Sequence, residues 1–202
     1  MGLYDRYLAL RIRLADEQLP ETVALVITER DLLETGAYRT LSEFFAWAFE
    51  YGAARVVVYV GVSTEATVSR LVEEFEQLTP PEPITIRTPA DEQPADTPIQ
   101  VSIGLGGKYE FAQAVQSIAA DVEAGNLRAT AVTEEVIEDR LVFPADPDLV
   151  IKTGAERLSD FMIWQSVYAE LHFTDVNWRN FRRREYLRAL RDYQTRKRRF
   201  GK

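Results

Sequence analysis

The chain contains no cysteine, a single histidine and two methionines among its 202 residues. The absence of cysteine excludes disulfide bonds and cysteine-ligated metal sites, and it fits a reducing compartment. No uninterrupted apolar stretch reaches the roughly 18 residues that cross a bilayer, and the first residues mix charges with leucines, unlike a signal peptide. We therefore expect a cytoplasmic protein whose only contact with a membrane would be peripheral.

Charge is distributed unevenly along the chain. The net charge is −8, yet residues 178–202 hold eleven lysines and arginines against only Glu185 and Asp192. Such a basic C-terminal helix and tail could bind nucleic acid, anionic lipid or a diphosphate, or it could form a solvated helix face. The strongly acidic remainder argues against a nucleic-acid partner, because it would repel the phosphate backbone.

Residues 1–202 are expected to form one domain. The length and the 46% hydrophobic content suffice for one sizeable core and do not require a second. Residues 79–98 contain six of the nine prolines and several acidic residues, which predicts a surface loop. Within this Pro-rich acidic loop only residues 84–88 look able to pair as a strand.

Apolar β-branched runs alternate with helical spacing along the chain. The runs at 22–28, 55–61, 99–103 and 147–152 are typical of buried strands. Helices are expected between them, and they would cover both faces of the strands. This order predicts an α/β fold with a mostly parallel central sheet flanked by helices.

Several helices carry recognisable faces and start signals. Thr40 with Glu43, Thr64 and Thr133 each have the spacing of an N-terminal cap, and Gly52 is placed to end a helix. Amphipathic helical stretches are also predicted at 161–168, in a helix that ends on Glu170, and at 181–193. Two helices have predicted apolar faces, which consist of Leu3, Tyr7, Leu10 and Leu14 near the start, and of Phe111, Val115, Ile118 and Val122 after the GLGGK turn.

Residues 152–175 read KTGAERLSDFMIWQSVYAELHFTD. Cations and hydroxyls at the end of a strand suit a diphosphate, because charge-assisted hydrogen bonds to phosphate oxygens are strong. The segment resembles a motif of the cis-prenyltransferases, the undecaprenyl and dehydrodolichyl diphosphate synthases, which reads Arg-Thr-Gly-Gly, Arg-Leu-Ser-Asn-Phe, Trp-Gln and Glu-Leu-Tyr-Phe-Thr-Asp. The resemblance covers residues 99–202 well and 20–78 more loosely.

This resemblance implies a set of site residues. By position, Lys152, Arg157 and Ser159 correspond to ligands of isopentenyl diphosphate, and Glu170 corresponds to a carboxylate that binds Mg²⁺. Lysine at 152 keeps the charge of the family's arginine but loses its bidentate fork. The ending Arg199-Phe200-Gly201 resembles the family's Arg-x-Gly motif, which reaches across a dimer interface, so Arg199 and Gly201 would contact the partner's diphosphate.

One departure from the family pattern concerns catalysis. Members that make product follow the first strand with Asp-Gly-Asn-Gly-Arg-Trp, and the Asp holds Mg²⁺. Here Thr28 falls at the position of that Asp, and Leu32 at the position of the Arg. A neutral hydroxyl is a poor ligand for Mg²⁺, and no glycine lets the backbone approach a diphosphate. The sequence therefore supplies no catalytic residue in this turn.

We predict an accessory, non-catalytic subunit of a heteromeric cis-prenyltransferase. Its partner would be a catalytic homologue that holds most of the Mg²⁺ coordination, and the contact would involve Phe161, Ile163, Trp164 and Tyr168. One alternative is an active homodimeric polyprenyl diphosphate synthase in which Glu29 or Asp31 replaces the missing Asp. Another is a regulatory anion-binding protein on the same fold, because fold alone does not determine function.

Four further residues are predicted to pack inside. The only histidine, His172, stands between two apolar residues and is expected to be a packed residue rather than an acid or base. Trp47 and Trp164 are expected in the core, and Trp178 beneath the basic helix.

Overall fold

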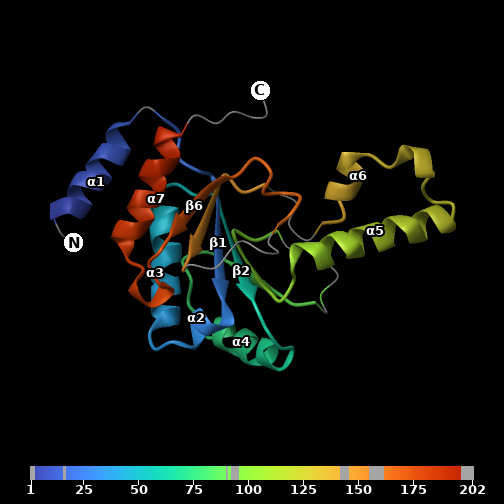
Figure 1. Cartoon of the computed structure of the whole chain (residues 1–202), viewed down its shortest axis with the longest axis horizontal. Helices are drawn as coiled ribbons and strands as arrows, with labels where there is room; N and C mark the ends of the chain where they lie inside the picture. The colour runs from blue at the N-terminus through green and yellow to red at the C-terminus, as the bar shows by residue number, and fades with distance from the viewer. Residues whose placement is uncertain are drawn as a thin grey trace.

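Six parallel strands form one central sheet in the order β3-β4-β2-β1-β5-β6 (Figure 1). This computed structural model describes residues 3–15, 17–89, 91, 96–141, 146–154 and 162–196. The strands are β1 (Thr22–Thr28), β2 (Arg55–Gly61), β3 (Ile84–Arg87), β4 (Ile99–Ile103), β5 (Leu149–Thr153) and β6 (Glu170–Thr174). The expected α/β class with a parallel sheet is confirmed, and β6 is a strand that the sequence analysis missed.

Seven helices occur in the described part of the chain. They are α1 (Leu3–Leu14), α2 (Glu29–Leu33), α3 (Ala37–Glu50), α4 (Ala66–Glu76), α5 (Gly107–Glu123), α6 (Glu134–Glu138) and α7 (Arg183–Thr195), with short 3₁₀ turns η1 (Ala129–Ala131) and η2 (Trp178–Asn180). None of these helices is both long enough and apolar enough to cross a membrane.

The main core lies between one face of the sheet and helices α3 and α7, which run side by side, with α1 on the outer side of α7 (Figure 1). Its centre is aromatic: Phe44 meets Trp178 and Tyr186 edge-on, and Phe181 stacks on Trp178. Trp178 is fully buried, and its indole Nε1–H donates a hydrogen bond to the Ala37 carbonyl at 3.1 Å. Trp178 is therefore buried in the main core, packed against α3 and Phe181.

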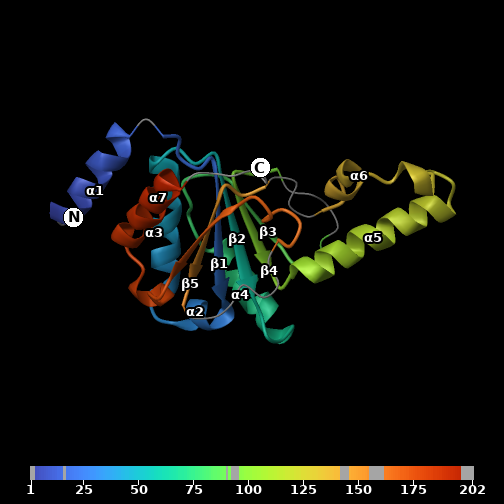
Figure 2. The ribbon, with the colours of Figure 1, turned by 45° about the horizontal axis from the view of Figure 1, so that its top comes forward.

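A smaller core covers the other face of the sheet. It consists of Ala24, Val26, Val57, Val150 and Met162, so the segment that follows residue 161 crosses this face. From here α5 leads away from the sheet, and together with α6 it forms a projecting arm (Figure 2). We call residues 107–138 the arm.

The arm starts where two glycines are required. Gly104 has a φ of +76°, a conformation that side chains rarely adopt, and a Cβ there would also lie 2.9 Å from Val62 Cγ2. At Gly107, the first residue of α5, a Cβ would lie 2.9 Å from the Ile163 backbone nitrogen. The GLGGK turn thus lets α5 begin in direct contact with residues 162 and 163.

Some local predictions were wrong. The N-cap residue of α3 is Gly36, with φ +83°, rather than Thr40, and the N-cap residue of α4 is Glu65 rather than Thr64. Thr133 caps α6 as predicted. Residues 163–168 are a series of turns rather than a helix, and Glu170 begins β6. The apolar spacing at 161–168 suggested a helix, but of residues 162–168 only Met162 and Gln165 are buried, whereas Ile163, Val167 and Tyr168 are exposed.

The predicted apolar faces of α1 and α5 are largely exposed. On α1 the buried residues are Leu8, Ala9 and Ile12, which face α7, while Tyr7, Leu10 and Leu14 face outward. On α5, Ile118 is buried but Phe111 and Val115 are exposed. Both helices therefore carry more apolar surface than this chain buries, which is unusual for a surface helix.

Candidate functional site

The carboxyl ends of β1 and β5 mark the place where an open parallel sheet usually binds ligands. The chain first builds the sheet from β1 towards β3 and β4, and then returns to place β5 on the other side of β1. The connections after β1 and β5 consequently diverge, and such a switch point is the usual ligand crevice of α/β proteins. Thr28 ends β1 and Thr153 ends β5, so both lie at this edge.

Thr28 is held in a closed hydrogen-bond system with Asp31. Its hydroxyl and its backbone N–H both donate to Asp31 Oδ2 at 2.8 Å. The Asp31 N–H in turn donates to Thr28 Oγ1 at 3.4 Å, which completes a capping box at the start of α2. The local sequence thus caps its own helix with the groups that would otherwise face a ligand.

Glu29 lies next to this cap and turns towards β2. Hydrogen bonding with Ser63 lowers the pKa of the Glu29 carboxyl below its usual range, with a smaller contribution from Thr67. Glu29 Oε2 is shielded from solvent and has no hydrogen-bond partner among the described residues. Because Glu29 remains charged and stands beside Asp31, the turn after β1 is negative and opposes a diphosphate.

A cavity of about 570 Å³ opens at the same edge, between the turns after β2, β3 and β4. It is rich in hydroxyl groups, and its described lining includes one acidic and no basic residue: Val62, Ser63, Thr64, Glu65, Val68, Ser69, Thr88, Pro89 and Gly104. A diphosphate site needs cations or a metal ion to balance its charge. The sequence analysis did not identify Ser63 and Thr64 as residues of a cavity, although hydroxyl residues directly after a buried strand could have indicated one.

These residues do not fit a Mg²⁺ centre. Mg²⁺ binds through free carboxylates together with water or substrate phosphates. Here Asp31 is used by the cap, Glu29 is held by Ser63, and Thr28 offers only a neutral hydroxyl. Moreover, residues 3–15, 17–89, 91, 96–141, 146–154 and 162–196 contain no group of three His, Asp or Glu side chains that could hold a metal ion.

The predicted diphosphate ligands are only partly described. Arg157, Ser159, Arg199 and Gly201 lie outside the described residues. Lys152 is on the same face of the sheet as Thr28, one residue before the end of β5, and it is buried. Its ammonium donates to the Thr153 carbonyl at 3.1 Å, and the buried Thr153 hydroxyl has no hydrogen-bond partner among the described residues.

Glu170 lies at the opposite edge of the sheet from Thr28. It pairs with Leu149, which pairs with Val23, five residues before Thr28. At about 3.3 Å per residue, this register separates the two positions by roughly 17 Å along the strands. Glu170 and Thr28 of one chain therefore cannot share a metal ion.

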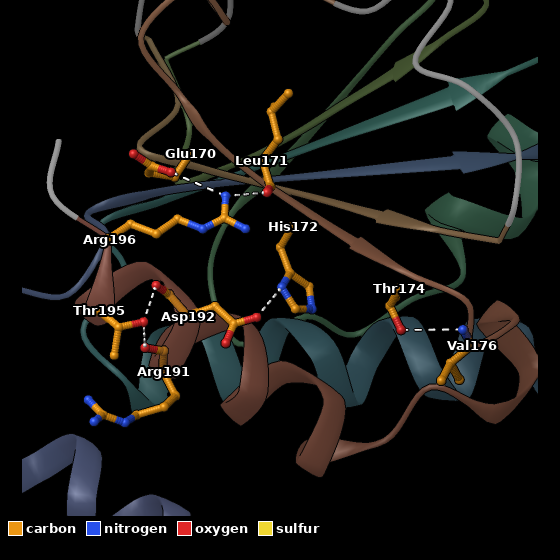
Figure 3. A network of polar contacts seen from close by, with 9 residues as sticks. All are labelled: Glu170, Leu171, His172, Thr174, Val176, Arg191, Asp192, Thr195 and Arg196. Atoms are coloured by element: carbon orange, nitrogen blue, oxygen red, sulfur yellow. Dashed lines mark hydrogen bonds and ion pairs between the residues drawn. The ribbon is translucent and has the colours of Figure 1, made fainter. Parts of the chain in front are cut away.

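Glu170 belongs instead to a polar network that ties α7 to β6 (Figure 3). Arg196, just after α7, bridges Glu170 Oε2 at 3.3 Å and donates to the Leu171 carbonyl at 2.7 Å. One residue further along β6, His172 Nδ1 lies 3.0 Å from Asp192 Oδ2. Both strand residues thus contact the C-terminal end of the basic helix or the residue just after it, and His172 is packed beside a carboxylate rather than in an apolar environment.

Stability is expected to fall between neutral and mildly acidic pH because of His172. Burial lowers the pKa of His172 below 6.5, and this effect outweighs the opposing Asp192. The unfolded chain therefore binds more protons than the folded one as pH falls through 6.5, and the free energy of unfolding falls with it. Urea unfolding at several pH values measures this, and His172→Gln should flatten the dependence, since the chain has no other histidine. An equal slope in both proteins would contradict the assignment.

The arm and residues 162–168 enclose a second cavity, of about 440 Å³. Its wall is aromatic and aliphatic with an acidic rim: Lys108, Phe111, Glu134, Glu138, Asp146, Ile163, Trp164, Val167 and Tyr168. Phe111 stacks on Trp164 with ring centres 5.9 Å apart, and the indole N–H of Trp164 donates to Glu138 at 3.2 Å. Trp164 is half-buried in this wall rather than in the core.

Buried polar residues fix the base of the arm. Gln165 donates to Glu110 at 3.1 Å, and Arg87 of β3 lies close enough to Glu110 for their charges to interact. Burial nevertheless lowers the pKa of the Arg87 guanidinium, because burial outweighs Asp91 and Glu110. The sequence analysis did not single out these residues, since only the tertiary structure brings β3, α5 and residue 165 together.

Some comparisons with known sequences match about half of the chain, and one matches nearly all of it. A family model described as "Putative undecaprenyl diphosphate synthase" matches residues 84–201, more than half of the chain. The tritrans,polycis-undecaprenyl-diphosphate synthase (geranylgeranyl-diphosphate specific) of Methanocaldococcus jannaschii is 46% identical over 110 residues, which are 52% of this chain and 39% of that protein. The protein of the same name from Pyrococcus abyssi is 32% identical over 248 positions, which cover 99% of this chain and 93% of that protein.

Solved structures share the fold. A lavandulyl diphosphate synthase from Lavandula x intermedia, solved with dimethylallyl diphosphate, superposes with a TM-score of 0.75 at 23% identity and covers 91% of this chain and 99% of that one. A probable undecaprenyl diphosphate synthase from Campylobacter jejuni has a TM-score of 0.66 at 19% identity, with coverage of 92% and 99%. Together with the matched family model and the Pyrococcus relative, these findings show that the chain belongs to the cis-prenyltransferase family of undecaprenyl diphosphate synthases.

Proposed function

We propose that this chain is the accessory, non-catalytic subunit of a heteromeric cis-prenyltransferase. The complex would make a long-chain polyprenyl diphosphate, a lipid carrier precursor, from isopentenyl diphosphate and an allylic diphosphate. The observation that carries the proposal is the capping box at Thr28, the residue at the position of the family's metal-binding Asp. Asp31 accepts hydrogen bonds from both the hydroxyl and the backbone N–H of Thr28. Because Asp31 is engaged by this cap, it is not free to bind a divalent ion.

In this proposal the partner is a homologue that carries the Asp missing here. Mg²⁺, when bound, would neutralise the charge of the diphosphates, and it would be held mainly by that partner. The partner would also form the tunnel for the growing chain. Arg199 and Gly201 of this chain would complete the partner's isopentenyl diphosphate site, and this role remains a prediction because both residues lie outside the described ranges.

The arm offers a suitable contact surface for such a partner. Phe111, Ile163, Val167 and Tyr168 are exposed and border the 440 Å³ cavity, and Val115 is an exposed residue of the same helix as Phe111. Aromatic and aliphatic side chains that surround a cavity, with charged groups at the rim, are typical of a protein interface. The buried Arg87, Glu110 and Gln165 hold this surface in place before the partner binds.

The rival proposal, an active homodimer, requires Glu29 or Asp31 to replace the missing Asp. Asp31 would have to leave the capping box, and the loss of such a cap costs about 1 kcal/mol. Glu29 would have to leave Ser63, whose hydrogen bond lowers the pKa of Glu29. Both carboxylates therefore already have structural partners, which favours the accessory role.

A reconstitution assay tests the proposal. The purified chain, an Asp-bearing homologue from the same organism, and an equimolar mixture are each incubated with Mg²⁺, an allylic diphosphate and labelled isopentenyl diphosphate. We expect no long product from this chain alone, and about a hundredfold more from the mixture than from the homologue alone, since charge placed on a diphosphate is worth about this much. Arg199→Ala should remove the gain.

Each other outcome has a definite meaning. Long product from this chain alone would support the homodimer and reject the accessory role. Equal activity for the mixture and the lone homologue would also reject it. In that case calorimetric titration with isopentenyl diphosphate and with inorganic pyrophosphate would examine the regulatory alternative, because a specific anion-binding protein should distinguish the two.

A further inference from the structure

Helix α1 is apolar on two opposite faces. Leu8, Ala9 and Ile12 face α7 and belong to the main core. On the outward side, Tyr7, Leu10 and Leu14 are 51%, 57% and 73% exposed. A helix of a soluble protein normally has one apolar stripe, and a second one indicates a second apolar neighbour.

Arginines surround this outward apolar face. Arg6, Arg11 and Arg13 belong to α1 itself, and the Arg11 guanidinium lies 5.7 Å from the ring centre of Tyr7. On α7, Arg184 and Arg188 are exposed, and Arg188 lies 5.8 Å from the ring centre of Tyr4. The face therefore combines exposed aliphatic groups, tyrosine rings and guanidinium groups within one pair of helices.

The charge of this region contrasts with that of the whole chain. Residues 3–15 and 182–196 contain nine arginines against three acidic residues, Asp5, Glu185 and Asp192, whereas the chain as a whole carries −8. Of the three acidic residues, Glu185 of α7 is itself buried and forms ion pairs with Arg184 and Arg188. Glu50 of α3 balances part of the charge through ion pairs with Arg13 and Arg183. The region remains clearly positive and attracts a negatively charged partner.

We propose that the outward face of α1, with the arginines of α7, binds the surface of an anionic lipid bilayer. In this arrangement α1 lies in the plane of the interface, with Leu10 and Leu14 at the boundary of the acyl chains. The guanidinium groups of Arg6, Arg11 and Arg188 contact lipid phosphates, and Tyr4 and Tyr7 lie at headgroup level. Interfacial helices have this composition, because apolar burial and attraction to anionic headgroups act together.

Other occupants fit this face less well. In a symmetric dimer the face would meet its own copy, so the arginines of both copies would approach one another. Nucleic acid would suit the arginines but would leave Leu10 and Leu14 exposed to water. The surface lies at the end of the molecule opposite the arm (Figure 1), so lipid and a partner subunit could bind at the same time. The inference does not depend on the proposed function.

Site-directed labelling tests the inference directly. The chain has no cysteine, so Leu10→Cys introduces the only thiol, which can carry an environment-sensitive fluorophore. Leu33→Cys on α2 is a matched control, because Leu33 is also a helical leucine and is 53% exposed. With vesicles of equal parts phosphatidylglycerol and phosphatidylcholine, we expect a blue shift at position 10 and none at 33. High salt should reduce the shift, since it screens the arginines.

Vesicle sedimentation with charged variants gives an independent measurement. We expect the double variant Leu10→Glu, Leu14→Glu to lower the partition coefficient about a hundredfold, because two leucines no longer enter the acyl boundary. Leu33→Glu should bind like the unmodified chain. The inference is overturned if the full chain does not bind anionic vesicles, if it binds phosphatidylcholine alone equally well, or if Leu10→Glu changes the oligomeric state instead of vesicle binding.

Discussion

Replacing Val115 and Val167 together with glutamate should weaken binding of the Asp-bearing partner by at least about a hundredfold. The two valines are 46% and 66% exposed, so the free chain should fold normally with glutamate at these positions. In the proposed complex they would be buried, and burial of an unpaired carboxylate in an apolar contact is strongly unfavourable. Calorimetric titration of the partner into the variant measures the change in affinity.

The two exposed apolar surfaces provide controls for each other. Leu10→Glu with Leu14→Glu on α1 should leave the affinity for the partner unchanged, and the arm variant should bind anionic vesicles normally. Circular dichroism checks that both variants remain folded. If the arm variant binds the partner as tightly as the unmodified chain, the partner does not bind through the arm, and another surface must be sought.

Replacing Trp178 with alanine should lower the free energy of unfolding by about 4 kcal/mol. Trp178 is fully buried, stacks on Phe181 and meets Phe44 edge-on, so its loss opens a large cavity in the centre of the main core. Trp178→Phe keeps most of the packing and removes the indole hydrogen bond to the Ala37 carbonyl, which should cost about 1 kcal/mol. Urea unfolding compares the three proteins.

Trp164→Ala is the matched control for this prediction. Trp164 is half-buried in the wall of the arm cavity, so its replacement leaves no enclosed cavity in the core. We expect a loss of less than about 2 kcal/mol, because most of the vacated space is open to water. The importance of the aromatic cluster is refuted if Trp178→Ala is no more destabilising than Trp164→Ala.

The elements that the sequence predicted best are those with strong local signals. Strands β1, β2 and β4 have their predicted bounds, since runs such as TVALVIT can only be buried on both faces of a parallel sheet. The predictions for residues 163–168 and for β6 were wrong because apolar spacing in a short segment does not distinguish a helix from turns or from a partly exposed edge strand. Their assignment depends on contacts with strands that are distant in the sequence.

The candidate site divides in a similar way. The neutral Thr28 at the end of β1 and the missing glycines could be read directly from the sequence. That Asp31 closes a cap on Thr28, and so is engaged elsewhere, required the geometry of the turn. The position of Glu170 was equally unreadable, because strand register, not sequence spacing, places it at the other edge of the sheet.

The sequence by itself determined the fold class, the family resemblance and the loss of a carboxylate after the first strand, since each of these follows from residue type and local order. Only the tertiary structure decided which apolar faces this chain covers for itself. The spacing of α1 and α5 predicts that they pack, but it does not say against what. The fold buries Leu8, Ala9 and Ile12 against α7 and leaves Leu10, Leu14, Val115 and Val167 exposed, because one small sheet cannot cover every apolar stripe that the sequence contains.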